Sequence, residues 1–412
     1  MKGNHLLLII FSILIYLTGC TSSVTGPDLN GELPRELSKV EMELVENGQS
    51  FSFNMFKSTV LGDESENIFI SPLSISLALG MTMNGARGET YNQMRETLAF
   101  QGLDMEEINS GYQTLIELLM NADPKVKMEI ANSVWSRQGF PIEEEFTDNL
   151  EEYFNAEARE LDFDDPASVD IINDWVSDNT NGLIEQIIEG GIPAEMIMYL
   201  INAIYFKGDW MYQFDKEDTQ EGPFYLENGE QVMVDMMSQK RDFNTHFSDK
   251  VHMIDLPYGD SLFSMTVMMP ADEGTILNEF IEQDLTKENF DSWTANLSGS
   301  EIPLRFPKFE LEYKVKLNDI LISMGMEDAF NGSKADLTGI NSNGGLSISE
   351  VKHKTFIKVD EAGTEAAAVT SVAIEVTSAP QTFSVNRPFV FVTREQNSGA
   401  ILFMGKINNP GV

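Results

Sequence analysis

The sequence predicts an α+β fold, and two observations carry that prediction. In the N-terminal half, apolar residues recur every three or four positions, which is the spacing of one face of an amphipathic helix. In the C-terminal half, apolar and polar residues alternate, which is typical of a strand with one buried face. Because the helical patterns come first and the strand patterns later, the chain favours α+β over an alternating arrangement of strands and helices.

Four stretches have the helical spacing, and we expect each to turn its apolar stripe toward the core. In chain order the stripes are Phe53, Phe56 and Val60; Ile108, Tyr112, Leu115 and Leu119; Phe146, Leu150 and Phe154; and Ile171, Ile172, Trp175 and Val176. Four later stretches predict strands. Residues 263–269 and 309–315 alternate, whereas 389–392 and 401–404 are short apolar runs that suit buried strands.

The first 20 residues form a targeting segment and take no part in the fold. Lys2 gives a positive start, and the apolar run at 6–17 is too short to span a bilayer as a helix. The run ends in Leu17-Thr18-Gly19-Cys20, which resembles a bacterial lipobox, and Cys20 is the only cysteine. The resemblance implies that Cys20 is lipidated, so we expect an exported, membrane-anchored lipoprotein that is periplasmic or on the cell surface, with release to the extracellular space as a further possibility. A plain secretory signal or a short membrane anchor is the alternative.

We divide the chain into a signal peptide (1–20), a flexible tether (21–44) and one domain (45–412). Residues 21–39 are rich in Ser, Thr, Gly, Pro and Asn, which is the composition of a linker. Length alone favours two or three domains, but no second linker and no internal repeat is present. The domain itself has no cysteine for a disulfide, so it depends on a large core, which a hydrophobic content of 42% allows.

The charge balance excludes one class of partner. The chain has 27 basic and 66 acidic residues, a net charge of -39, and no run of Lys or Arg forms a basic patch. Such a surface repels nucleic acid and anionic polysaccharide. We therefore expect no nucleic-acid partner and a membrane contact only through the lipid on Cys20.

Residues suited to catalysis or metal binding are sparse. Beyond the targeting segment the histidines are His246, His252 and His353, and no two have the spacing of a close ligand pair. No GxSxG, P-loop or GxGxxG motif is present. Acidic pairs are too common in so acidic a chain to indicate a glycosidase. We therefore expect no enzyme activity, no metal and no cofactor.

One stretch near the C-terminus has a distinctive period of two. Its uncharged set is Thr364, Ala366, Ala368, Thr370, Val372, Ile374 and Val376, whereas the intervening set carries Glu365 and Glu375. A strand places the two sets on opposite faces, so one face suits burial. Gly363 suits a turn at the entry. An ordinary strand, an alanine-rich helix and a mobile segment that inserts into a sheet all remain open at this point.

Several blocks, in a fixed order across about residues 45–410, resemble the serpin family, the serine-protease inhibitors that trap their target by loop insertion. Each block alone is weak, but together they are specific. The blocks are 67–75 with 84–86, 131–135, 172–176 with 180–182, 200–210, 302–313, 321–330 with 335–338, 361–378, 386–389 and 403–406. The resemblance implies one large α+β domain with N-terminal helices, a large central sheet and an exposed reactive-centre loop.

The resemblance also assigns roles. In serpins a protease cuts the loop and forms an acyl-enzyme, and the cut loop then inserts as a new central strand and distorts the protease. By position, the hinge of the loop is Glu361, Gly363, Thr364, Ala366, Ala367 and Ala368. The polar "shutter" under the opening sheet is Ser71, Ser74, Asn202 and His353. Trp210 matches the "breach", where the loop first enters. The shutter residues equally fit an ordinary buried hydrogen-bonded network, and Trp210 fits an ordinary core aromatic residue.

The serpin resemblance implies a position for the reactive bond, which is found by counting residues along the loop from either end. In antitrypsin-like loops the bond follows the sixteenth residue after the hinge glutamate, and the same residue lies eleven before the proline of Asn-Arg-Pro-Phe. Both counts give Thr377-Ser378, and Val376 is the runner-up. Thr377 is neither basic nor large, so we expect elastase-like or subtilisin-like serine proteases with shallow apolar primary pockets as targets.

We therefore expect a monomeric inhibitor that acts by suicide-substrate trapping, with cleavage near Thr377-Ser378 and insertion of 364–376. The alternative is a non-inhibitory serpin that acts as a surface chaperone or binding protein. Charged or bulky residues on the inserting face of the hinge would favour that alternative. The residues on that face are Thr364, Ala366 and Ala368, which are small and uncharged, so they favour inhibition. An unrelated surface adhesin is disfavoured by the ordered blocks.

Overall fold

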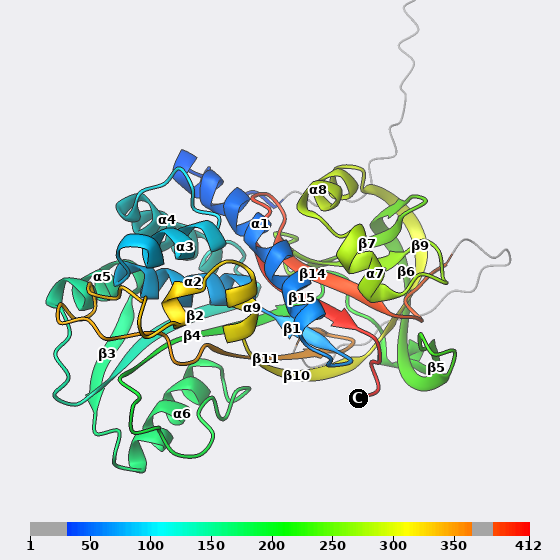
Figure 1. Cartoon of the computed structure of the whole chain (residues 1–412). Helices are drawn as coiled ribbons and strands as arrows, with labels where there is room; N and C mark the ends of the chain where they lie inside the picture. Colours follow the sequence, from blue (N-terminus) through cyan, green and yellow to red (C-terminus); the bar gives the residue numbers. More distant parts are fainter. Residues whose placement is uncertain (1–30, 365–381) are drawn as a thin grey trace, which may run out of the picture.

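The computed structural model describes residues 31–364 and 382–412, which form two β-sheets with helices packed mainly around one end of them (Figure 1). The helices in the described residues are α1 (Lys39–Gly62), α2 (Pro72–Asn84), α3 (Gly88–Thr97), α4 (Met105–Met120), α5 (Glu144–Phe154), α6 (Ala167–Asn179), α7 (Leu277–Gln283), α8 (Lys287–Ala295) and α9 (Asn318–Ser323). The α+β prediction is confirmed.

The strands form a six-stranded sheet and a nine-stranded sheet. The six-stranded sheet has the order β10 (Phe309–Lys316), β11 (Lys352–Val359), β12 (Gly363–Thr364), β4 (Met198–Asp209), β2 (Val126–Arg137) and β3 (Ala156–Leu161). The nine-stranded sheet has the order β1 (Ile68–Ile70), β15 (Ile401–Ile407), β14 (Phe389–Glu395), β8 (Phe263–Pro270), β7 (Val251–Tyr258), β6 (Gln231–Phe247), β9 (Ser298–Pro307) and β13 (Phe383–Ser384), with β5 (Gln220–Tyr225) paired to β6. Strands β8, β14 and β15 are buried on both faces.

Helix α2 joins the two sheets. It contacts β4 of the six-stranded sheet and β15 of the nine-stranded sheet, and eleven of its 13 residues are buried. A helix that is apolar nearly all round suits such a position. Ser71 caps its first turn, since its hydroxyl oxygen accepts from the backbone N–H of Ser74, and Pro72 occupies the first helical position. The cap places Ser71 directly beneath the six-stranded sheet.

The first helix begins earlier than the sequence patterns indicate. The expected tether extends to residue 44, but α1 starts at Lys39, six residues before the predicted boundary at 45. Ser38 and Glu41 form a capping box, in which each side chain accepts from the other residue's backbone N–H. Arg35 holds the Glu41 carboxylate at 2.6 Å and, with backbone and hydroxyl donors, lowers its pKa to about 2. The capping box is the sequence signal that the composition argument missed.

The expected apolar stripes occupy the core except on α6, where Ile171 is exposed and Trp175 is half-buried. The stripes of α1, α4 and α5 are buried, and in α6 Ile172 and Val176 are buried while Ile171 is 39% exposed. The four expected strands are β8, β10, β14 and β15. The N-terminal half also supplies β1 to β4, which the helical stripes did not indicate.

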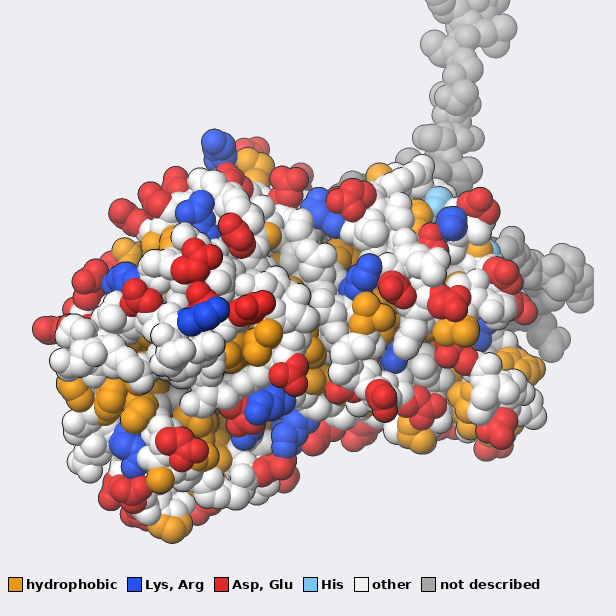
Figure 2. All heavy atoms as spheres, in the orientation of Figure 1, with side chains coloured by type: hydrophobic (Ala, Val, Ile, Leu, Met, Phe, Trp, Pro, Cys, Tyr) orange, Lys and Arg blue, Asp and Glu red, His pale blue; other side chains and the backbone are white. Residues whose placement is uncertain are grey.

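The surface is acidic throughout the face shown in Figure 2, with Lys and Arg scattered among Asp and Glu. On β10 the exposed charges are Glu310, Glu312, Lys314 and Lys316, and two of them pair across to lysines of β11: Lys354–Glu312 and Lys358–Glu310 close at 2.8 Å. Among the described helices, none combines the length and the apolar character needed to cross a membrane.

Candidate functional site

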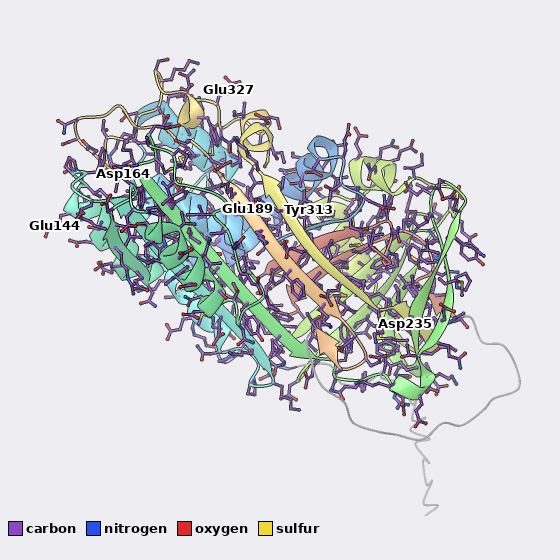
Figure 3. All side chains as sticks on the ribbon, turned by 90° about the horizontal axis from the view of Figure 1, so that it is seen from below. Glu144, Asp164, Glu189, Asp235, Tyr313 and Glu327 are labelled. Atoms are coloured by element: carbon purple, nitrogen blue, oxygen red, sulfur yellow. The ribbon has the colours of Figure 1, made fainter. Side chains whose placement is uncertain are left out.

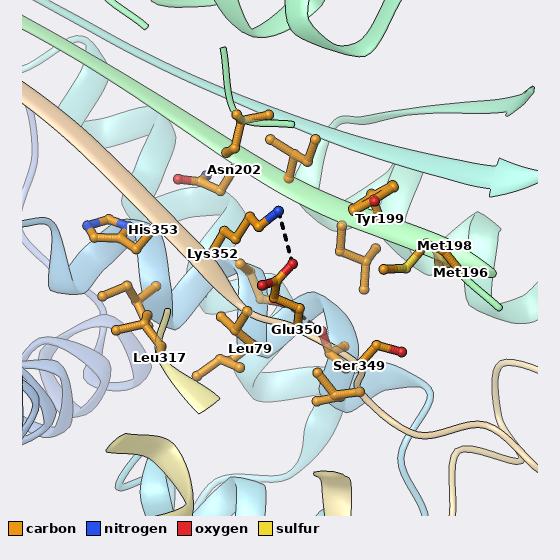
Figure 4. Close-up of a pocket in the computed structure, with 18 of the residues that line it drawn as sticks. Leu79, Met196, Met198, Tyr199, Asn202, Leu317, Ser349, Glu350, Lys352 and His353 are labelled. Atoms are coloured by element: carbon orange, nitrogen blue, oxygen red, sulfur yellow. Dashed lines mark hydrogen bonds and ion pairs between the residues drawn. The ribbon is translucent and has the colours of Figure 1, made fainter. Parts of the chain in front are cut away.

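The six-stranded sheet is interrupted between β4 and β11. Strand β4 pairs along its length with β2, and β11 pairs along its length with β10. Within the described residues, only the two-residue strand β12 bridges the facing edges of β4 and β11, at one end. Beside these edges lies a cavity of ≈ 390 Å³, lined by residues of β4, β11, α2 and the segment that follows α6 (Figure 4). The sheet therefore has a place for one further strand.

Thr364 lies at the end of the gap that β12 bridges. It pairs with Val359 on one side and with Gly208 on the other, and it is 7% exposed. Its hydroxyl lies 2.8 Å from the phenol oxygen of Tyr258. Burial raises the pKa of Tyr258, so the phenol stays neutral and shares a hydrogen bond with Thr364.

Trp210 lies at the same place. Its ring stacks on Tyr258 with centroids 4.4 Å apart, and its indole N–H donates to the Asp360 carbonyl at 2.9 Å. Its backbone N–H donates to the Ala362 carbonyl at 2.8 Å. Trp210, which the resemblance assigned to the entry point of the loop, thus holds the turn between β11 and β12 through side chain and backbone.

Gly363 is required by close approach of two backbones. A Cβ at this position would lie 2.2 Å from the carbonyl oxygen of Gly208 and 2.7 Å from the Cα of Asp209. Every other residue type would therefore push β12 away from β4. The glycine allows Thr364 to reach Tyr258.

Glu361 is buried just before the hinge and carries its charge there. Its carboxylate accepts from the Thr219 hydroxyl at 2.8 Å and lies 3.2 Å from the Lys308 ammonium. Burial alone would raise its pKa, but a backbone N–H, Thr219 and Lys308 together hold the pKa below its usual value. These contacts tie the turn to the residue that precedes β5 and to the residue between β9 and β10.

The shutter residues fall into two groups on either side of the gap. In the first, the backbone N–H of Ser71 donates to His353 Nε2 at 2.9 Å, and the Ser71 hydroxyl donates to the Leu402 carbonyl at 2.8 Å. The Ser71 hydroxyl oxygen also accepts from the Ser74 N–H at 3.2 Å. Because Nε2 accepts, the ring hydrogen of neutral His353 is on Nδ1. Burial lowers the pKa of His353 to about 3.

Asn202 lies on β4, on the other side of the gap from His353 of β11, and both residues line the cavity (Figure 4). Its amide N–H donates to Asn132 on β2 at 2.8 Å, and Asn132 in turn donates to the Phe154 carbonyl at 2.7 Å. The side-chain oxygen of Asn202 is buried and has no hydrogen-bond partner among the described residues. An unpaired buried acceptor is costly, so this oxygen marks a place where a donor is missing.

The segment after α6 crosses in front of the gap. Its Ile184 and Ile188 are buried and line the cavity. Asn173 of α6 fixes the segment, since it donates to the Ile188 carbonyl and accepts from the N–H groups of Ile187 and Ile188. Glu189 then meets Lys314 of β10 at 2.7 Å, and Figure 3 shows it beside that strand. Hydrogen bonding to Lys314 lowers the pKa of Glu189. The segment thus reaches from the β4 side of the gap to the β10 side.

Some expected site residues lie outside the described part of the chain. They are Cys20, Ala366, Ala367, Ala368, Val376, Thr377 and Ser378.

Four residues of the site were missed from the sequence: Tyr258, Thr219, Lys308 and Asn132. Each contacts a site residue from a distant part of the chain, and no local pattern signals such a contact. Within the described residues, no group of His, Cys, Asp or Glu is arranged to hold a metal ion.

Comparison with known proteins shows which family this chain belongs to. The model of the serpin (serine protease inhibitor) family matches residues 46–410. The chain belongs to the serpin family. Among curated relatives, the leukocyte elastase inhibitors of Xenopus tropicalis and Homo sapiens are each 35% identical over 87% of this chain and 97% of their own length. A serpin-like protein of Thermococcus kodakarensis is 32% identical over 98% of both chains.

Solved serpin structures have the same fold. The native state of the thermophilic serpin tengpin superposes with a TM-score of 0.81 at 34% identity, covering 92% of this chain and 97% of tengpin. The latent state of tengpin gives a TM-score of 0.77 over 90% of this chain and 98% of tengpin. This serpin is thus similar over nearly its whole length to proteins whose general function is inhibition of proteases, and it is not expected to be a catalyst.

Proposed function

We propose that this serpin traps serine proteases as a suicide substrate, with residues 364–376 entering the gap between β4 and β11 after cleavage of the loop. The observation that carries the proposal is the gap itself, which holds β12 at its entrance and a cavity beside it. Thr364 already pairs with both neighbouring strands, so insertion continues a ladder that has begun. Backbone groups on both sides of the new strand would then gain partners.

The register of β12 fixes where each inserted residue would lie. Thr364 pairs with Gly208, and β4 runs antiparallel to β12, so Ala366 falls opposite Phe206 and Thr370 opposite Asn202. On the other side Thr364 pairs with Val359, so Thr370 falls opposite His353. Side chains alternate along a strand, and Thr364 points inward to Tyr258, so the uncharged set points inward with it. Glu365 and Glu375 would stay on the outer face.

Thr370 would meet both halves of the shutter. Its hydroxyl has one hydrogen to donate and lone pairs to accept. The Asn202 side-chain oxygen lacks a donor, and His353 carries a hydrogen on Nδ1. We infer that an inserted Thr370 donates to Asn202 and accepts from His353. The shutter residues thereby act as a polar receptor for the middle of the inserted strand.

The chemistry of trapping needs no catalytic group from this chain. The serine oxygen of the protease bonds to the carbonyl carbon of Thr377, and the peptide nitrogen of Ser378 leaves with a proton as the new N-terminus. Insertion then moves the ester-linked protease away from the entrance before water can reach the acyl bond. A small residue at Thr377 favours elastase-like or subtilisin-like enzymes, and relatives named leukocyte elastase inhibitors support this class.

Incubation with a protease panel tests the proposal. We expect complexes that survive a denaturing gel with elastase-like enzymes and none with trypsin, because residues 359–386 contain no Lys or Arg. The peptide released from the complex should begin at Ser378, or at Thr377 if Val376 is the reactive residue. Tight trapping of trypsin, or a released peptide that begins at Glu375 or earlier, would overturn the assignment. Cleavage without any stable complex would favour the alternative of a non-inhibitory binding protein.

We also propose that the domain is exported and anchored by a lipid on Cys20. The lipobox-like Leu17-Thr18-Gly19-Cys20 and the uniqueness of Cys20 support this anchoring. A cysteine that carries a diacyl group and an additional acyl chain would bind the membrane stably, since two or more chains are needed. Cells fed a fatty-acid analogue should label the parent protein and leave Cys20→Ala unlabelled. Equal labelling of both would contradict the proposal.

A further inference from the structure

Phe247 is an exposed aromatic residue beside the point where the reactive loop rejoins the body. It ends β6 and is 39% exposed. Its ring lies 5.8 Å from the ring of Phe383, the first residue of β13, and 5.1 Å from the ring of His252 in an edge contact. One face of Phe247 thus packs on the anchor of the loop, and the remainder is open to solvent.

The surface around Phe247 is hollow, with mostly uncharged side chains near the ring and both acidic and basic side chains around them. An open cavity of ≈ 500 Å³ adjoins the ring and is lined also by His246, Asn296, Ser298 and Ser300. Burial and the nearby Arg387 lower the pKa of His252, so this neighbour is neutral at pH 7. Glu301 also lines the cavity and pairs with Lys240 at 2.5 Å, whereas Asp249 is exposed at the margin.

Chain length determines what must cover this surface during trapping. Ser378 and Phe383 are five residues apart, so the cut bond lies at most ~18 Å from Phe383. A protease domain of ~200 residues has a radius of gyration of ~16–17 Å, which corresponds to a sphere of ~21 Å radius. A protease that holds the bond in its cleft therefore extends over the surface around Phe383. Phe247 is the exposed aromatic residue in contact with Phe383.

We propose that Phe247, with His246 and the adjoining cavity, is a second contact surface for the body of the captured protease. This inference rests on the proposed trapping function. The partner that fits is a serine protease with an apolar projection and a basic margin beside the leaving-group side of its cleft. The net charge of -39 and the exposed Asp249 complement that basic margin. Aromatic side chains are the residues that most often dominate such contacts.

The test measures the second-order rate constant of association with a protease that the parent traps. Phe247→Ala should lower this constant about tenfold, the effect of losing one aromatic hot spot, while the stoichiometry of inhibition stays at the parent's value. Asp249→Lys, in an exposed turn, should lower the constant for a basic protease and weaken its dependence on salt. The matched control is Leu61→Ala, which removes a 55% exposed side chain on α1. Thermal unfolding of each variant checks the fold.

The outcomes separate the two proposals. A parent that traps no protease overturns the proposed function, and the contact surface with it. A parent that traps normally while Phe247→Ala and Asp249→Lys associate at the parent's rate overturns the contact surface alone. If Phe247→Ala proves unstable, the result for Asp249→Lys at low and high salt decides.

Discussion

Thr364 is the residue on which the proposed trapping depends most directly. Its side chain is buried against Tyr258 at the entrance of the gap, and the inserted strand continues from it. We predict that Thr364→Arg turns the inhibitor into a substrate, because a buried, unpaired guanidinium costs several kcal/mol as the strand begins to enter. Cleavage at the loop should persist while complexes that survive a denaturing gel are lost.

The matched control is Glu365→Arg, one residue away. Position 365 belongs to the set that alternates to the outer face, so an arginine there stays in water. It should form complexes at the parent's yield. If Thr364→Arg also forms stable complex at the parent's yield, the burial argument is wrong.

His353 makes the stability of the native state depend on pH. Its pKa is about 3 in the folded chain and near 6.5 when exposed. Between these values the unfolded chain binds a proton that the folded chain does not, so the free energy of unfolding falls on acidification. The contribution is complete above about pH 6.5, and we predict a loss of ~2 kcal/mol by pH 5.

Denaturant unfolding between pH 7 and pH 5 measures this effect. His353→Gln should make the free energy of unfolding depend less steeply on pH between pH 7 and pH 5. His252 has a pKa lowered in the same direction, so His252→Gln shows how much of the slope arises elsewhere. Glu41 has a folded pKa of about 2, and its effect falls below pH 4.5, outside the window. An unchanged slope in His353→Gln would contradict the assignment.

At the scale of elements, β12 decides whether the gap is closed at its entrance. We predict that Gly363→Ala displaces β12 from β4, because the added Cβ would meet the backbone of Gly208 at 2.2 Å. Such overpacking costs roughly 1–3 kcal/mol. Amide exchange should accelerate at Trp210, whose N–H donates to Ala362.

Gly191→Ala is the control for this change. A Cβ at Gly191 would have nothing within 4 Å. It should leave both the stability and the exchange of the Trp210 amide unchanged. Equal exchange rates in the parent and Gly363→Ala would show that close approach does not hold β12.

The sequence predicted elements better than it predicted contacts between them. The stripes of α1, α4 and α5 and the alternation of β10 are local patterns, and the structure follows them. Strand β2 was missed because its buried positions include the polar residues Asn132, Ser133 and Ser136. The family blocks pointed to Trp210 and the shutter residues, whose roles in insertion stay predictions. Nothing local indicated that Tyr258 would meet Thr364, 106 residues away, or that Lys308 would meet Glu361.

At the scale of the molecule, charge and fold act on different steps. The net charge of -39 influences which proteases approach and how fast, since it acts over long distances and is screened by salt. In the proposed mechanism, the interrupted sheet acts only after the loop is cut. Substitutions of surface charges should therefore change the rate of association with the protease. Substitutions in the hinge should instead change the fraction of encounters that end in a stable complex.

The last prediction concerns the stability of the whole chain after cleavage. In the proposed mechanism, a cut near Thr377 would free 364–376 to fill the space between β4 and β11, which would add hydrogen bonds on both sides and an apolar face against the cavity. A net gain of several kcal/mol, at ~2 °C per kcal/mol for a large domain, predicts a rise in melting temperature of ~10 °C or more. Heat unfolding of intact and cleaved protein measures it. A variant that lacks 366–374 has no strand to insert and should show no rise on cleavage. A parent that gains no stability when cut would mean that the gap does not receive the loop.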